Sequence, residues 1–109
     1  MIIIRNERRM RESNNWEPAG IDTAVNFFYH NYNQSLFVAG LGNGFSFRME
    51  ARPKRLNPSV LEMSAGGRND ALVVGFRHVR KVSVMRRDSD TVTSVSLLMK
   101  DGASLIFTV

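Results

Sequence analysis

The chain of 109 residues has no cysteine, only three prolines and only two histidines. Without cysteine it can form neither a disulfide framework nor a thiolate nucleophile or thiolate metal site. No apolar run approaches the roughly 20 residues that a membrane-spanning helix needs. The apolar run at residues 2–4 is too short for a secretory signal. These absences predict a cytoplasmic protein with no membrane contact.

The hydrophobic content argues against a disordered chain. Hydrophobic residues make up 43% and charged residues 23% of the sequence, as in folded globular domains. Chains of roughly 100–150 residues are the commonest single domains. We therefore expect one domain over residues 1–109, in which residues 1–20 form a partly flexible arm.

Positive charge dominates the ionisable residues. Fifteen lysines and arginines stand against ten acidic residues, which gives a net charge of +5 and a pI near 10.4. Only three of the fifteen are lysines, at positions 54, 81 and 100. Arginine binds phosphate through a flat fork and stacks on bases, so the bias favours a polyanionic partner. A GC-rich genome is the alternative explanation.

The charges are segregated along the chain. Residues 13–47 contain no lysine or arginine, whereas residues 48–55 contain four and residues 68–87 contain six. This asymmetry predicts a molecule with one basic face and one uncharged face.

Alternation of apolar and polar residues is clearest near the carboxyl end. Residues 92–99 and 103–109 alternate with period two, which is typical of half-buried strands. A three-residue loop with Gly102 in the left-handed conformation pairs Leu97 with Leu105. Because this register collects the large apolar side chains on one face, we expect a bulged hairpin.

A second hairpin is predicted at Asn43-Gly44, a strong signal for a two-residue type I′ turn. Its register pairs Gly40 with Phe47, so that the aromatic ring covers a bare glycine. Phe45 shares the face of Phe47 and is therefore expected in the core.

Two segments decide where the helix lies. Residues 23–30 fit helical spacing, but their aromatic and β-branched residues favour a strand. We expect a strand there that turns at residues 31–34, with a helix as the alternative. The helix is expected near residues 58–65, because Asn57 is an N-cap candidate and Pro58 suits the first helical position.

The remaining long segment also favours strands. Residues 71–87 are too long for one strand, and Gly75 is expected to mark a bend. The sequence therefore predicts a mainly β fold: a small antiparallel barrel or sandwich of six to eight strands, with one short helix near residues 58–65.

Residues suited to catalysis or metal binding are scarce. His30 lies among aromatic residues and His78 among arginines, and their spacing forms no metal-binding motif. Asp88 and Asp90 flank one serine, where aspartate is expected to cap a turn. No nucleophile or phosphate-loop motif is present. We therefore expect no enzyme activity, catalytic residue, metal, cofactor or small-molecule substrate.

Cations beside aromatic residues form the candidate site. Small β-barrels bind single-stranded nucleic acid by stacking rings on bases and lining the backbone with cations. The predicted function is a non-enzymatic basic module that binds nucleic-acid phosphates with low sequence specificity. A solvated basic surface without a ligand is the plainer interpretation. The predicted contacts are Arg77, Arg80, Lys81, Arg86 and Arg87, with Arg52, Lys54 and Arg55 as a second group.

The alternative function is protein interaction or assembly, as in an accessory subunit of a virus, phage or mobile element. The partner, another protein or a second copy, would contact the uncharged block of residues 13–47 through Trp16, Tyr29 and Tyr32. Trp16 is also suited to plug one end of a barrel. Val109 falls within a strand pattern, so we expect an exposed strand edge there.

Overall fold

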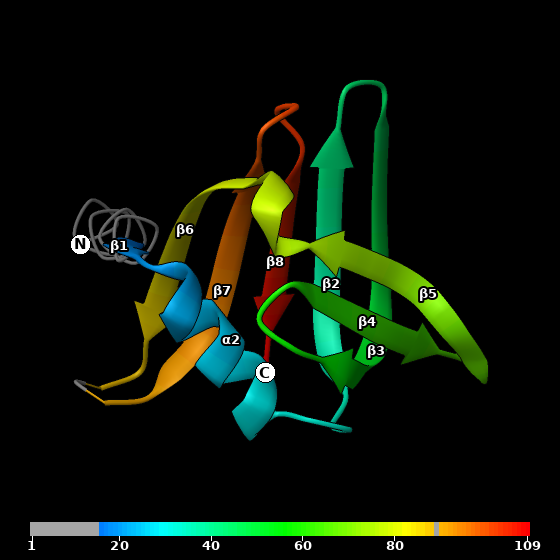
Figure 1. The fold of residues 1–109 in the computed structure, drawn as a ribbon, viewed down its shortest axis with the longest axis horizontal. Helices are drawn as coiled ribbons and strands as arrows, with labels where there is room; N and C mark the ends of the chain where they lie inside the picture. Colours follow the sequence, from blue (N-terminus) through cyan, green and yellow to red (C-terminus); the bar gives the residue numbers. More distant parts are fainter. Residues whose placement is uncertain (1–15, 89) are drawn as a thin grey trace, which may run out of the picture.

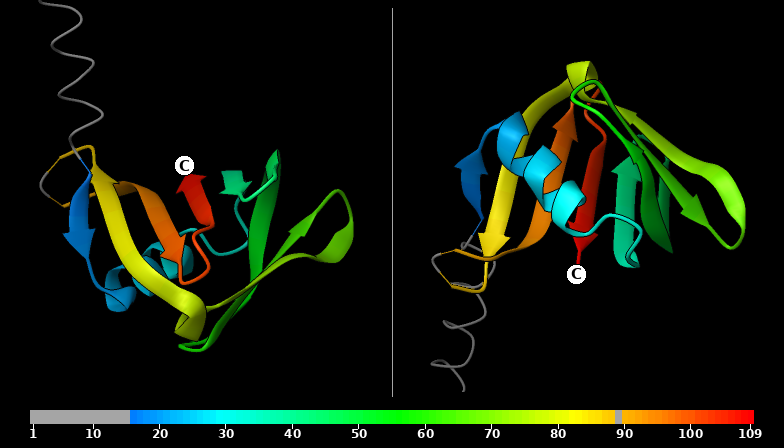
Figure 2. Two further views of the ribbon diagram at one scale, coloured as in Figure 1. Left: turned by 90° about the horizontal axis from the view of Figure 1, so that it is seen from above. Right: turned by 60° about the horizontal axis from the view of Figure 1, so that its bottom comes forward.

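The computed structural model describes residues 16–88 and 90–109. Eight antiparallel strands form one sheet in the order β1-β6-β7-β8-β2-β3-β4-β5 (Figure 1). One helix, α2, lies against the concave face of this bent sheet (Figure 2). The predicted mainly β fold is confirmed. The sheet is open, however, and it replaces the expected barrel or sandwich because the helix covers the core in place of further strands.

The chain builds the sheet in two meanders. The described part of the chain begins with β1 (Glu17–Ala19) and α2 (Ile21–His30). The first meander consists of β2 (Leu36–Gly42), β3 (Phe45–Leu56), β4 (Val60–Ala65) and β5 (Arg68–Gly75). The short 3-10 helix η1 (Phe76–His78) then leads to the second meander, which consists of β6 (Val79–Arg86), β7 (Val92–Met99) and β8 (Ser104–Thr108). Pairing of β8 with β2 joins the meanders.

Residues 23–30, which were expected to form a strand, lie within α2. Helical spacing buries Ala24, Phe27 and Phe28 on one side of this segment. The side-chain amide of Asn31 donates to the carbonyl oxygen of Phe27 at 2.9 Å and so satisfies the end of the helix. Burial of a helical face therefore outweighs the modest helix propensity of the aromatic residues.

Residues 58–65, which were expected to form the helix, make the end of the β3–β4 turn and strand β4. The side-chain oxygen of Asn57 accepts hydrogen bonds from two following backbone N–H groups at 2.8 and 2.9 Å, as a cap does. Asn57 caps a turn instead of a helix because the residues that follow form a strand. In this strand Leu61 and Met63 are buried with period two, and the strand pairs with both β3 and β5.

Both predicted hairpin registers are confirmed. Leu97 pairs with Leu105, and Gly102 has a φ of +95°, which favours glycine. Gly40 pairs with Phe47, and a Cβ atom at Gly40 would overlap the Phe47 ring. Turn chemistry and side-chain alternation are local properties, and they fix these registers without help from the rest of the fold.

The core centres on Phe28. Its ring meets Phe107 of β8 edge to face, with centroids 4.9 Å apart, and stacks on Phe76 of η1 at 6.5 Å. Phe27 contacts it at 5.3 Å. All four rings are buried. One side chain thus ties the helix, the crossing between meanders and the last strand together.

The strand edge expected at Val109 is not exposed. β8 pairs with β7 on one side and β2 on the other, and the backbone N–H of Val109 donates to the carbonyl oxygen of Thr93 at 3.1 Å. The strands at the ends of the sheet are β1 and β5. Of the arm predicted over residues 1–20, residues 1–15 lie outside the described residues, whereas Glu17–Ala19 form β1.

The Gly40–Phe47 packing can be tested by substitution. In Gly40→Ala the added Cβ overlaps the ring, and overpacking of this kind costs about 1–3 kcal/mol of unfolding free energy. Chemical denaturation should show this loss. In a Phe47→Ala background the same Gly40→Ala change should cost much less, because the ring is gone. Equal costs in the two backgrounds would contradict the packing.

Candidate binding surfaces

Four exposed cations gather where η1 meets the β7–β8 turn. Arg77 belongs to η1, Arg80 and Lys81 to the start of β6, and Lys100 to the turn. The backbone N–H of Lys100 donates to the carbonyl oxygen of His78 at 2.8 Å, which fastens the turn to η1. None of the four forms an ion pair with a carboxylate of the described residues. We call these four residues the cationic rim.

A histidine and an aspartate lie beside the cationic rim. The Nε–H of Arg77 donates to Nε2 of His78 at 3.3 Å, which orients the guanidinium group. Asp101 lies in the same turn, where its carboxylate accepts the backbone N–H of Ala103 at 3.0 Å. The region therefore carries four positive charges and one negative charge, and its potential is positive overall.

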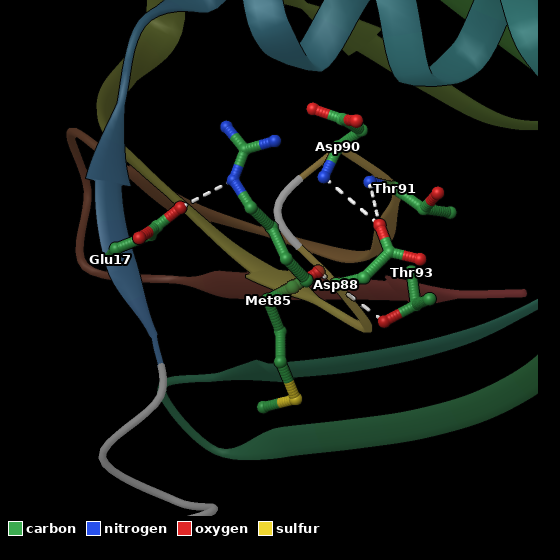
Figure 3. Close-up of polar contacts among 7 residues, drawn as sticks. Glu17, Met85, Asp88, Asp90, Thr91 and Thr93 are labelled. Carbon is green, nitrogen blue, oxygen red and sulfur yellow. Dashed lines mark hydrogen bonds and ion pairs between the residues drawn. The ribbon is translucent and has the colours of Figure 1, made fainter.

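The other predicted cations of β6 do not join the rim. Arg86 ends that strand and Arg87 follows it, so they lie about 17 to 20 Å from Lys81 at roughly 3.3 Å per residue. The Nε–H of Arg86 also donates to Glu17 at 2.5 Å (Figure 3). Arg55 of β3 has a similar partner, because its guanidinium group lies 3.7 Å from Glu62.

Arg52 and Lys54 lie on the second half of β3, where that strand pairs with β4. The ammonium group of Lys54 donates to the side-chain oxygen of Asn33 at 2.9 Å, and the Tyr32 hydroxyl donates to the carbonyl oxygen of Lys54. Lys54 thus helps to hold the α2–β2 loop against the sheet. The fold therefore divides the eight predicted cations among separate parts of the sheet.

The convex face of the sheet carries an apolar row on β2. Phe37, Ala39 and Leu41 alternate with the core residues of that strand, and Phe37 and Leu41 are 60% and 62% exposed. The register places Ile106 of β8 beside Ala39. The row lies within residues 13–47, but Phe37 and Leu41 were not among the predicted contacts. The only sign of them in the sequence is that residues 36–42 are apolar or glycine at both the inward and the outward positions of the strand.

The aromatic residues predicted as protein contacts lie on different segments. Trp16 is half-buried just before β1, Tyr29 is 54% exposed on α2, and Tyr32 is 46% exposed in the loop that follows. Phe45, expected in the core, is 55% exposed, and its ring covers Gly42 near the tip of the β2–β3 hairpin. The ten-residue helix is about 15 Å long and leaves this tip uncovered.

A pocket of about 500 Å³ opens between α2 and the β6–β7 turn. Asn26 and His30 line it from the helix, Arg86 and Asp90 line it from the turn, and buried Phe27 contributes an apolar wall. Its charged side chains are exposed to solvent and carry both signs. Such a lining can accept a small polar molecule, but it contains no buried, unpartnered group that would select one.

Asp88 caps the β6–β7 turn, as its position between two strands predicted. Its side-chain oxygen accepts the backbone N–H groups of Asp90 and Thr91 at 2.9 and 3.0 Å (Figure 3). These hydrogen bonds, that of Asp90 foremost, lower the pKa of the Asp88 carboxyl group below its ordinary value of 3.8. Within residues 16–88 and 90–109, no three histidines or acidic residues gather as a metal site would require.

No protein-family model, curated protein or solved structure matches the chain. In the part of the chain that the structure describes, no helix has the length and apolar character to cross a bilayer.

The role of Asp88 predicts a pH-dependent effect of Asp88→Ala. The pKa of Asp88 is lower in the folded than in the unfolded chain, so its stabilisation is present above about pH 3.8 and is lost as the pH falls through the folded value. Denaturation at pH 7 should therefore show a less stable variant, and the difference should shrink at pH 2. Asp90→Ala leaves both hydrogen bonds in place and should show no such trend. A constant difference for Asp88→Ala would contradict this role.

Proposed function

We propose that the protein is a non-enzymatic binding module whose cationic rim contacts nucleic-acid phosphates with low sequence specificity. The observation that carries this proposal is the hydrogen bond between Lys100 and His78. It brings a cation from the β7–β8 turn beside the three cations of η1 and β6. Because none of the four is paired with a described carboxylate, their charge is available to an external anion.

The exposure of the rim favours an extended polyanion. Its side chains stand at the surface, where each contact with a phosphate releases condensed counterions. Phosphate contacts position a nucleic acid without reading its sequence. The tip of the β2–β3 hairpin lies at the same end of the strands as η1 and the β7–β8 turn (Figure 1). Phe45 at the start of β3 is exposed, and such a ring is a surface on which a base can stack.

Two double variants of equal charge test the proposal. Arg77→Gln with Arg80→Gln removes two rim cations, whereas Arg55→Gln with Arg86→Gln removes two cations that are already ion-paired. Fluorescence anisotropy with labelled single-stranded DNA and RNA should show affinity that falls with salt. The rim variant should lose about 1.4 from the logarithmic salt slope, since each contact with a single strand contributes roughly 0.7.

The paired variant is the matched control and should keep most of the wild-type salt slope. Glu17 and Glu62 already neutralise its two guanidinium groups, so their loss should remove few phosphate contacts. Two results would overturn the proposal: no binding of either nucleic acid at low salt, or an equal loss of slope in both double variants.

A second candidate function is protein interaction or assembly through the convex face. Phe37 and Leu41, two large apolar side chains that α2 leaves uncovered, favour it. Exposed apolar side chains that adjoin one another are typical of interaction sites. The row lies on the opposite face of β2 from the core, so this function is compatible with nucleic-acid binding at the cationic rim.

A further inference from the structure

One cation and one anion of β3 lie beside the apolar row of β2 on the convex face. The register places Glu50 of β3 beside Phe37 and Arg48 beside Ala39. Both charged side chains are exposed, and neither forms an ion pair with another described residue. Two opposite charges thus stand next to the row, two residues apart on one strand, without an ion-pair partner among the described residues.

Side-chain size also alternates along this face. On β2 the large Phe37 is followed by the small Ala39 at the next outward position. On β8 the neighbours of these two residues are Thr108 and Ile106. A protruding ring beside a shallow position can interdigitate with an inverted copy of the same surface, as side chains do between packed sheets.

We propose that this convex face binds a second copy of the chain, sheet against sheet. A two-fold axis that runs across the strands, between the levels of Phe37 and Ala39, places each Phe37 on Ala39 of the other copy. The same axis places each Arg48 opposite Glu50 of the other copy. Both unpaired charges then gain a partner, and two-fold symmetry repeats each contact. This inference deepens the second candidate function and does not depend on nucleic-acid binding.

The size of the face indicates a weak dimer. The strands β7, β8, β2 and β3, about 4.8 Å apart and each roughly seven residues long, present at most about 400 Å² per copy, since two convex faces do not meet over their whole width. Stable interfaces bury about 800 Å² per partner. We therefore expect reversible association that depends on protein concentration. The orientation is set by the two charge pairs, because complementary charges fix register more than they add affinity.

Charge exchange between two variants tests this interface. Arg48→Glu places two negative charges beside the row and Glu50→Arg places two positive charges there, so each variant should repel its own copies. Sedimentation velocity over a rising concentration series, without nucleic acid, should show a dimer for the wild type. Each variant alone should stay monomeric at concentrations where the wild type associates. An equimolar mixture of the two should associate again.

Two phenylalanine variants distinguish association through the convex face from non-specific association of exposed apolar side chains. Phe37→Ser should raise the concentration needed for association at least tenfold. Phe45→Ser, which removes a ring of similar exposure on the other face of the sheet, should leave association unchanged. Circular dichroism verifies that each variant is folded. A wild type that is monomeric throughout, or a variant mixture that does not associate, overturns the proposal. If a monomeric chain binds nucleic acid, the proposed function of the cationic rim is retained and only the dimer is refuted.

Discussion

The whole arrangement depends on one ten-residue helix covering the concave face of the sheet. Phe28 of α2 contacts η1 and β8 at once, and these elements belong to the crossing between meanders and to the second meander. An eight-stranded sheet with one buried face needs such a cover, because its apolar face is otherwise in water. The helix is shorter than the longest strands, so hairpin tips stay uncovered. The convex face is exposed because the helix lies on the opposite, concave face. Both candidate surfaces lie in these uncovered regions.

The length of β6 keeps the cations at its two ends apart. β6 separates the rim cations from Arg86, which Glu17 neutralises. Lys100 joins the rim from a turn that follows β7. The result is a small positive patch where η1 meets the β7–β8 turn, together with a convex face on which Arg48 and Glu50, neither paired with a described residue, lie beside the apolar row. The molecule therefore presents two surfaces of different character, and neither includes the pocket between α2 and the β6–β7 turn.

Local patterns predicted the hairpins and the mainly β class, because turn glycines and period-two alternation act over a few residues. They misplaced the helix. In α2 the burial of Phe27 and Phe28 decides the structure, and this depends on the sheet. At Asn57 the same cap chemistry suits a turn as well as a helix. The rim could be predicted only in part, since the hydrogen bond that adds Lys100 is tertiary. Phe37 was missed because β2 is apolar in both phases.

The position of β8 has a kinetic consequence. It is the last strand along the chain, yet it lies at the centre of the sheet between β7 and β2. Its contacts with β2 join residues about 70 positions apart, and contacts of such large sequence separation slow folding because loop closure precedes the gain from pairing. Within each meander, neighbouring strands can pair quickly through short hairpins. The two meanders can join only after the distant strands β8 and β2 have paired. We therefore expect the pairing of β8 with β2 to set the rate of folding.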